Sequence, residues 1–263
     1  MDQNPFTQFI STIESVKHGS NTVYMTVLNY GYIPYTMNML ISLSKWGLDR
    51  KILLVCLDRK SYEFLIQRGY TSACCFDTNI TDFEAFGKGE YAKICFFKLL
   101  SICKILELGY DILYTDGDIV YFKNPIEAMK EFTGEYDIWI QNDMYMEGFK
   151  DNMCTGYFYL KSNETTREQF NLDSDIAKYN FFTGDYDQCY FNLHIKPHIL
   201  CKLLPLVDYP NGQVFYGNPG LRNSCVLAHF NWIKGHEKMD KMKEHGVWVE
   251  GGGALWECAP TRR

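Results

Sequence analysis

Segments with strand and helix patterns alternate through the first half of this chain, and that alternation most constrains its fold. Thr22–Leu28 and residues 51–57 and 72–76 are short, mostly apolar runs typical of buried strands. Between them, residues 35–46 and 58–67 have helical patterns, the first opened by a proline and each followed by a glycine. This order predicts an α/β fold with a parallel sheet covered by helices on both faces. Ligands of such sheets bind beyond the carboxyl ends of the strands.

The second half of the chain is less regular. We expect a long amphipathic helix, a strand that ends in acidic residues, two aromatic strands, a polar helix and Gly/Pro/Asn-rich loops. In chain order these are residues 91–108, Asp111–Thr115, 137–140, 156–160, 164–178 and 210–219. The sequence contains no internal repeat and no Pro/Ser linker, which predicts one domain over residues 1–248. Residues 249–263, with three successive glycines, are expected to form a loosely ordered tail.

Composition narrows the classes of partner. The chain has 26 lysines and arginines against 32 aspartates and glutamates, a net charge of −6, which argues against a nucleic-acid-binding surface. The most apolar long stretch, residues 94–108, contains three charged side chains and predicts a buried helix rather than a membrane span. We see no secretory signal and no disulfide pattern among the ten cysteines, so we expect a cytoplasmic protein with reduced thiols.

The most informative motif is Asp116-Gly117-Asp118, which directly follows the strand Asp111–Thr115. Two carboxylates one residue apart can both reach one hard cation, and Gly117 lets the backbone approach a ligand closely. Mg²⁺ or Mn²⁺ held in this way would neutralise a diphosphate leaving group. A simple polar turn is the plain alternative, because Asp-Gly is a common turn dipeptide.

A second alternative is a phosphatase similar to the haloacid dehalogenases. In that interpretation Asp116 would be the nucleophile and Asp118 the general acid and base. The motif of those enzymes usually opens the domain, whereas about 115 residues with three expected strands precede it here.

Four ordered segments resemble one family. They are TVLNYGYIPY (26–35), GYDILYTDGDIVYFKNP (109–125), TGYFYLKS (155–162) with Asp187-Gln188, and HFNWIKGHEK (229–238). The chain thereby resembles the nucleotide-diphospho-sugar transferases of the GT-A fold, in the family that includes plant cell-wall arabinosyl- and xylosyltransferases and viral enzymes of large DNA viruses. This resemblance implies a Rossmann-like, mostly parallel central sheet.

The implied activity is transfer of a sugar from a nucleotide-diphosphate donor, UDP in our expectation, to a hydroxyl of a glycan or glycoprotein, with retention of configuration. A viral member would work in the host cytoplasm. An inactive carbohydrate-binding module with the same fold is a further alternative. Neither the sugar nor the linkage follows from the motifs.

The resemblance also implies a metal site formed by Asp116, Asp118 and His229. An imidazole beside two carboxylates shifts the preference from Mg²⁺ toward Mn²⁺, because Mg²⁺ seldom takes nitrogen ligands. Without the resemblance, His229 would be read as a packed structural histidine.

The remaining site residues follow from the same resemblance. Gly235 and Lys238 would close on the diphosphate, and Lys98 would face the nucleotide, although each lysine could equally lie on a solvated helix surface. The nucleoside would be read by residues after the first two strands, namely Thr26, Asn29, Tyr32 and Asp58, the last of which could instead cap its helix.

The catalytic pair implied by the resemblance is Asp187 and Gln188. Asp187 would hold hydroxyls of the donor sugar, and the Gln188 amide oxygen would stabilise developing positive charge on the face opposite the leaving group. An acidic first turn of a helix would explain Asp187 equally well. Thr155 and Gly156 would contact the sugar through their backbone.

Overall fold

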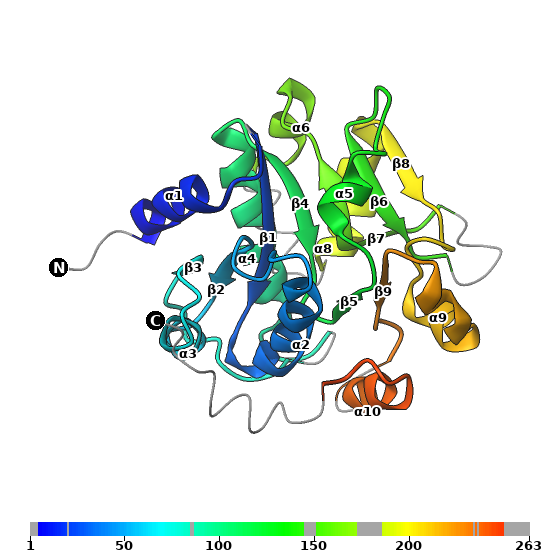
Figure 1. The fold of residues 1–263 in the computed structure, drawn as a ribbon. Helices are drawn as coiled ribbons and strands as arrows, with labels where there is room; N and C mark the ends of the chain where they lie inside the picture. Colours follow the sequence, from blue (N-terminus) through cyan, green and yellow to red (C-terminus); the bar gives the residue numbers. More distant parts are fainter. Residues whose placement is uncertain are drawn as a thin grey trace.

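The computed structural model describes residues 5–19, 21–84, 87–144, 151–172, 186–233, 235 and 237–249. Its centre is a seven-stranded sheet with the order β3-β2-β1-β4-β7-β6-β8 (Figure 1). The strands are β1 (Thr22–Leu28), β2 (Leu53–Cys56), β3 (Ala73–Cys75), β4 (Asp111–Thr115), β6 (Ile138–Asn142), β7 (Met153–Leu160) and β8 (Cys201–Leu204).

Six strands of this sheet run in one direction. β1 pairs in parallel with β2 and β4, β2 with β3, and β6 with β8, whereas β7 is antiparallel to both of its neighbours. A separate two-stranded antiparallel ribbon joins β5 (Ile119–Tyr121) to β9 (Leu227–His229). The prediction of a mostly parallel sheet is confirmed, and its parallel strands end at the edge where the acidic motif lies.

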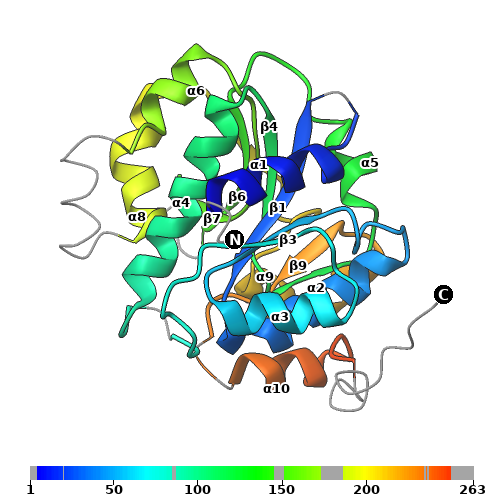
Figure 2. The same cartoon turned by 90° about the vertical axis from the view of Figure 1, so that its left-hand side faces the viewer.

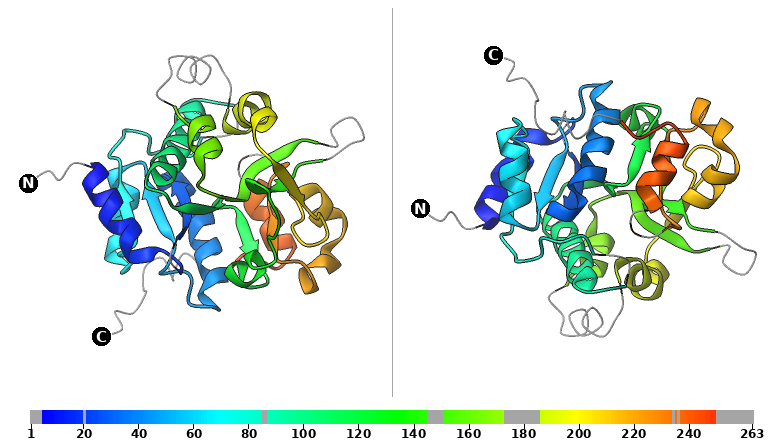
Figure 3. Two further views of the ribbon diagram at one scale, coloured as in Figure 1. Left: turned by 90° about the horizontal axis from the view of Figure 1, so that it is seen from above. Right: turned by 90° about the horizontal axis from the view of Figure 1, so that it is seen from below.

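Helices cover both faces of the sheet. α1 (Pro5–Val16) and α4 (Tyr91–Glu107) pack on one face, where Phe9 and Ile102 join a cluster of strand side chains. α2 (Ile33–Ser44) and α3 (Arg59–Gln67) pack on the other. Figure 2 shows α1 crossing in front of the strands with α4 beside it, and Figure 3 shows α2 on the opposite side of the sheet. Burial of apolar surface on both faces is what holds these layers together.

A third apolar cluster lies beside the two-stranded ribbon. α9 (Gly212–Gly217) and α10 (Glu237–Glu244) lie next to β9 in Figure 1. Phe215 from α9 and Met242 from α10 are buried against Phe230, the residue that follows β9. This cluster holds α9 and α10 against the two-stranded ribbon and against Tyr35 of α2. The remaining short elements are η1 (Tyr30–Tyr32), α5 (Pro125–Met129), α6 (Glu164–Gln169), α8 (Asp187–Tyr190), η3 (Phe191–Ile195), η4 (Lys196–His198) and η5 (Pro219–Asn223).

Most expected elements are present, and the differences have local causes. β1 and β4 have the predicted bounds, and Asp58 caps α3 by accepting a hydrogen bond from the Ser61 backbone N–H. The prediction of loops over residues 210–219 is wrong, because the side chain of Asn211 caps a helix, α9, by accepting from Val214 N–H. α1, α5, β5, β8 and β9 were not predicted from the sequence, and each of them is short or near a terminus.

Two further sequence predictions include residues that the structure does not describe. The polar helix predicted over residues 164–178 is present as α6, which ends at Gln169, and residues 173–178 are not among those described. Most of the predicted tail, residues 250–263, also lies outside the described part. Within the described ranges, no helix has both the length and the hydropathy needed to cross a membrane.

Candidate functional site

A cavity of about 530 Å³ opens where the parallel strands end. This volume lies in the range of about 300–1,000 Å³ that ligand pockets usually have. Twelve of the fifteen site residues expected from the sequence line it. They are Tyr32, Lys98, Asp116, Gly117, Asp118, Thr155, Gly156, Asp187, Gln188, His229, Gly235 and Lys238.

The two carboxylates of the acidic motif are held by the strands around them. The Asp116 backbone N–H donates to the Gly156 carbonyl at 2.7 Å, which ties the end of β4 to β7. The Tyr114 hydroxyl donates to Asp116 Oδ1 at 2.8 Å, so the carboxylate has a fixed orientation. Asp118 directly precedes β5, and its carbonyl accepts from the Phe230 backbone N–H at 3.1 Å. The motif is therefore part of the framework of the site rather than a solvated turn.

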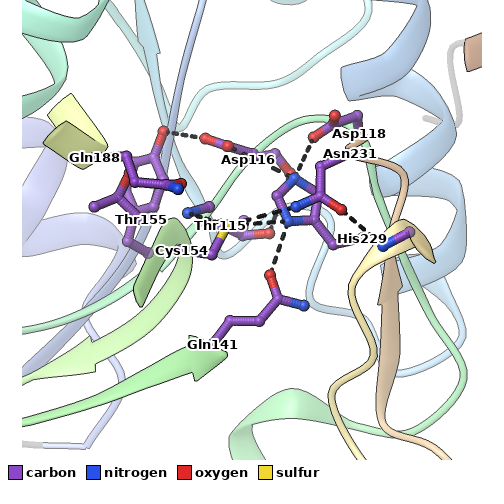
Figure 4. A network of polar contacts seen from close by, with 12 residues as sticks. Thr115, Asp116, Asp118, Gln141, Cys154, Thr155, Gln188, His229 and Asn231 are labelled. Carbon is purple, nitrogen blue, oxygen red and sulfur yellow. Dashed lines mark hydrogen bonds and ion pairs between the residues drawn. The ribbon is translucent and has the colours of Figure 1, made fainter. Parts of the chain in front are cut away.

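His229 joins the carboxylates through the small ribbon. The β5–β9 register pairs His229 with Ile119, the residue after Asp118. Its Nε2 lies 3.3 Å from Asp118 Oδ1 and 3.9 Å from Asp116 Oδ2, and Figure 4 shows the ring facing both carboxylates. Two ligand bonds of about 2.1 Å at a right angle separate their donor atoms by about 3 Å. The three side chains, whose ligand atoms lie within 4.8 Å of one another, fit one divalent cation.

Opposite charges around this group balance one another. Lys238, from α10, forms an ion pair with Asp118 through Oδ2, which leaves Oδ1 facing His229. Burial by itself raises the pKa of Asp118, but Lys238 and His229 outweigh burial and hold that pKa below its usual range. Burial lowers the pKa of His229, yet the Asp118 carboxylate beside it raises that pKa well above the ordinary value. The site thus stabilises the carboxylate form that a metal requires.

A second buried ion pair connects the floor of the cavity to α8. Lys98 Nζ lies 2.6 Å from Asp187 Oδ2 and 3.3 Å from Asp116 Oδ1, and only 5% of Lys98 is exposed. Burial lowers the pKa of Lys98, but the two carboxylates outweigh it and raise this pKa well above the usual value. Thr155 Oγ1 donates to Asp187 Oδ2 at 2.7 Å. Asp187 is the first residue of α8, as the alternative of an acidic first helical turn predicts, and it also lines the cavity. Its role toward a donor sugar stays a prediction.

Asp143, which the sequence analysis missed, organises the opposite wall. Its carboxylate accepts hydrogen bonds from Gln188 Nε2 at 2.8 Å, Trp232 Nε1 at 3.0 Å, and the side-chain amides of Asn231 and Asn152 at 3.2 Å each. Burial raises the pKa of Asp143, although these donors oppose the shift. A polar side chain directly after the aromatic strand β6 was the available signal in the sequence. Because Gln188 donates through Nε2, its amide oxygen is the end not bonded to Asp143.

Two glycines of the site are required by close packing. A Cβ on Gly156 would lie 2.3 Å from His229 Cε1 and 2.9 Å from Asp116 Oδ2. A Cβ on Gly117 would lie 2.7 Å from Thr36 Oγ1. The space that a side chain of Gly156 would need is therefore occupied by the metal-binding group itself. The sequence analysis expected Gly156 to allow a sugar to approach, whereas the contacts visible here are with the protein.

Three predicted nucleoside-binding residues do not line the cavity. Asp58 Oδ1 accepts from Ser61 N–H at 2.9 Å and Oδ2 from Tyr30 N–H at 2.8 Å, so its carboxylate caps α3 and holds the neighbouring turn. Asn29 caps η1 with its side-chain oxygen. Thr26 lies inside β1 rather than beyond it, and its side chain is fully buried. The side chains of Asp58 and Asn29 therefore support the turns behind the cavity, and Thr26 is packed within the sheet.

Aromatic side chains and one glycine complete the lining of the cavity. The Tyr32 ring packs against Phe83 with 4.7 Å between ring centroids, and Tyr91 lines the cavity as well. Gly235, two residues before the start of α10, has a φ of +58°, a conformation that favours glycine. The cavity thus combines an aromatic wall near β1 with a charged floor, and Lys238 extends from α10 to Asp118.

Comparisons with known proteins agree with this arrangement. A profile of the family described as nucleotide-diphospho-sugar transferase matches residues 47–244, more than half of the chain. UDP-galactose:fucoside alpha-3-galactosyltransferase of Dictyostelium discoideum is 26% identical over 90% of this chain and 44% of that protein. Beta-arabinofuranosyltransferase RAY1 of Arabidopsis thaliana is 24% identical over 90% of this chain and 49% of that protein. The chain spans less than half the length of these two relatives.

Solved structures show the same fold at low sequence identity. The galactosyltransferase LgtC, solved with donor and acceptor sugar analogues, matches 90% of this chain and 97% of that chain with a TM-score of 0.55 and 15% identity. A glycosyltransferase involved in glycosylation of the major capsid of PBCV-1 matches 85% of this chain and 99% of that chain, with a TM-score of 0.52 and 14% identity. The α/β architecture is that of the GT-A glycosyltransferases.

Proposed function

This chain belongs to the nucleotide-diphospho-sugar transferase family, and we propose that it is a metal-dependent glycosyltransferase that uses a UDP-linked sugar. The observation that carries the proposal is the convergence of Asp116, Asp118 and His229 in a cavity that Lys98 and Lys238 also line. Family membership argues against the phosphatase alternative. The polar-turn alternative explains the motif less well, because both carboxylates of this turn face His229 within the cavity.

We propose Mn²⁺ as the metal, with Mg²⁺ as the competing ion. One imidazole nitrogen and two carboxylates form a donor set that suits Mn²⁺ better than Mg²⁺. When bound, the ion would neutralise the diphosphate and make it a better leaving group. Asp118 can serve this site through Oδ1 while Lys238 keeps Oδ2, so the lysine holds the carboxylate in place without blocking it.

The residues around the metal group support a role in donor binding. Lys238 lies at the start of α10, next to Gly235, where its ammonium group can meet a phosphate oxygen. On the opposite side, Asp187 keeps one oxygen engaged by Lys98 and Thr155. We propose that the other oxygen accepts hydrogen bonds from hydroxyls of the donor sugar.

We further propose transfer with retention of configuration. The support is the orientation of Gln188, whose Nε2 is fixed by Asp143 and whose amide oxygen can stabilise positive charge that develops on the sugar ring. Gln188 and Asp187 both line the cavity, so both would be within reach of the same sugar. Inverted product would remove this role for Gln188 and leave the transferase assignment intact.

The acceptor that we propose is a fucose-terminated glycan or glycoprotein. The names of two relatives, the Dictyostelium galactosyltransferase above and UDP-D-xylose:L-fucose alpha-1,3-D-xylosyltransferase 3 of Arabidopsis, specify fucose acceptors. In this chain Trp232 lines the cavity, is 43% exposed and has a φ of +65°. A bulky residue in that conformation carries strain that the surroundings must offset. Its exposed indole face offers a stacking surface for the apolar side of a pyranose.

The test begins with calorimetric titration of UDP with and without Mn²⁺, on the wild type and on Asp118→Asn. We expect UDP binding that needs both Mn²⁺ and Asp118, and no effect of Glu127→Gln, a surface carboxylate on α5. A panel of UDP-galactose, UDP-xylose and UDP-arabinose with methyl fucoside as acceptor then identifies the donor, and NMR of the product gives its configuration. Metal-independent glycan binding without any transfer would instead establish a carbohydrate-binding module.

A further inference from the structure

Gln141 is a fully buried polar residue next to the metal-binding group that no motif in the sequence singled out. It lies near the end of β6, where the register with β7 shifts between Ile140 and Gln141. Such irregularities commonly redirect a side chain next to a functional site. Its amide reaches His229 on one side and the loop after β8 on the other (Figure 4).

The surroundings leave one orientation for the Gln141 amide. Its nitrogen lies 3.1 Å from the carbonyl oxygen of Tyr209 and 3.1 Å from that of Pro210. Carbonyl oxygens only accept hydrogen bonds, so the NH₂ group must face them and supply one hydrogen to each. In the opposite orientation the amide oxygen would face the same two carbonyl oxygens in a buried place. The amide oxygen and both carbonyls would then lack a hydrogen-bond donor. Gln141 Oε1 therefore faces His229.

This orientation decides which imidazole nitrogen carries the hydrogen. His229 Nδ1 lies 2.8 Å from Gln141 Oε1, an atom that can only accept, so Nδ1 donates. The other neighbour of Nδ1, Cys154 Sγ at 3.6 Å, is a weaker partner at a longer distance. In the neutral ring the lone pair then lies on Nε2, the nitrogen that faces Asp116 and Asp118.

We propose that Gln141 is a positioning residue that fixes the tautomer and the ring plane of His229 so that Nε2 is the metal ligand. Ligating histidines commonly use their second nitrogen in this way, and loss of such a partner costs about 10–100-fold in metal affinity. The same Pro210 carbonyl also accepts the His229 backbone N–H at 3.2 Å. One loop therefore fixes the backbone of His229 directly and its ring through Gln141.

The proposal rests on the metal site of the proposed function, but it does not require sugar transfer. Its test is Mn²⁺ affinity of the whole protein without nucleotide, measured by the electron paramagnetic resonance signal of free Mn²⁺. Gln141→Met keeps the approximate length of the side chain and removes both ends of the amide. We expect the Kd for Mn²⁺ to rise by about 10–100-fold.

Gln141→Glu separates positioning from general packing. A glutamate keeps an oxygen for Nδ1 but no longer donates to both carbonyls, so we expect Mn²⁺ affinity within about threefold of wild type together with a lower melting temperature. Asn38→Leu is the matched control, because Asn38 is a buried amide bonded to Val247 and Val249, away from this group. It should lower stability and leave Mn²⁺ affinity unchanged.

The tautomer itself can be read by long-range ¹H–¹⁵N correlation spectra of histidine-labelled protein with diamagnetic Zn²⁺ bound. We expect His229 to show a protonated Nδ1 and a metal-shifted Nε2. Wild-type Mn²⁺ affinity in folded Gln141→Met, equal losses in Gln141→Met and Gln141→Glu, or metal on Nδ1 would each overturn the proposal. Failure of the wild type to bind Mn²⁺ would overturn it too, whereas binding without sugar transfer would count against the proposed function alone.

Discussion

Gly156→Ala should remove His229 from the metal site by adding one methyl group. The new Cβ would lie 2.3 Å from His229 Cε1 and 2.9 Å from both His229 Nδ1 and Asp116 Oδ2. To restore contact distances near 3.5 Å, the ring must retreat by about 1 Å. Metal sites tolerate errors of only about 0.2 Å in ligand distance, so the imidazole would be lost as a ligand. We expect Mn²⁺ affinity to fall at least about 100-fold, or about 2.8 kcal/mol.

The cost in folding should be smaller than the loss in metal binding. Overpacking of a well-packed interior usually costs about 1–3 kcal/mol, and in the metal-free protein the ring can yield toward the two carboxylates that it faces. Circular dichroism melts and urea titrations of the metal-free protein measure the loss of folding stability. Electron paramagnetic resonance measures Mn²⁺ affinity. Gly217→Ala is the control, because no atom lies within 4 Å of its added Cβ. Wild-type Mn²⁺ affinity in folded Gly156→Ala would refute the reasoning.

Three further predictions concern the other walls of the cavity. Lys98→Met should destabilise the metal-free protein by about 3–5 kcal/mol in urea titrations, because it leaves the buried Asp187 unpaired. Pairing with Lys98 lowers the pKa of Asp187, so the ionised Asp187 contributes its full stabilisation of the wild type above a pH of about 4. This contribution is lost as the pH falls below that value. Lys98→Met should therefore weaken the dependence of the unfolding free energy on pH in this range. Asp143→Asn should lower kcat on the order of 100-fold, because it displaces Gln188, while calorimetry shows unchanged UDP affinity. Trp232→Ala should raise the KM for acceptor about tenfold and Trp232→Phe less than threefold, and equal KM values in both variants would contradict a stacking role.

Local sequence signals predicted the first half of the fold well. The apolar strands β1 and β4 have their predicted bounds, and the cap of α3 by Asp58 follows from the preference of aspartate for that position. The acidic motif could be placed at the sheet edge because a parallel strand directly precedes it. These features depend on neighbours in the chain, which is why a sequence read by itself can supply them.

Other features depend on residues far apart in the chain. β5 and β9 are too short to carry a strand pattern, yet their pairing places His229 beside Asp118. From the sequence, only the family resemblance placed His229 there. Asp143 and Gln141 went unnoticed because a single polar residue at a strand end is ambiguous until its partners are known. The single-domain boundaries and the cytoplasmic location stay predictions.

The sequence by itself determined the strand–helix order, the position of the acidic pair and the family to which the chain belongs. Tertiary structure decided which atoms of those residues meet. It committed Asp58 and Asn29 to the turns behind the cavity, and it filled the space beside Gly156 with the imidazole of His229. The physical reason is that periodicity and capping act over a few residues, whereas burial, ion pairing and close packing are set by elements that only folding brings together.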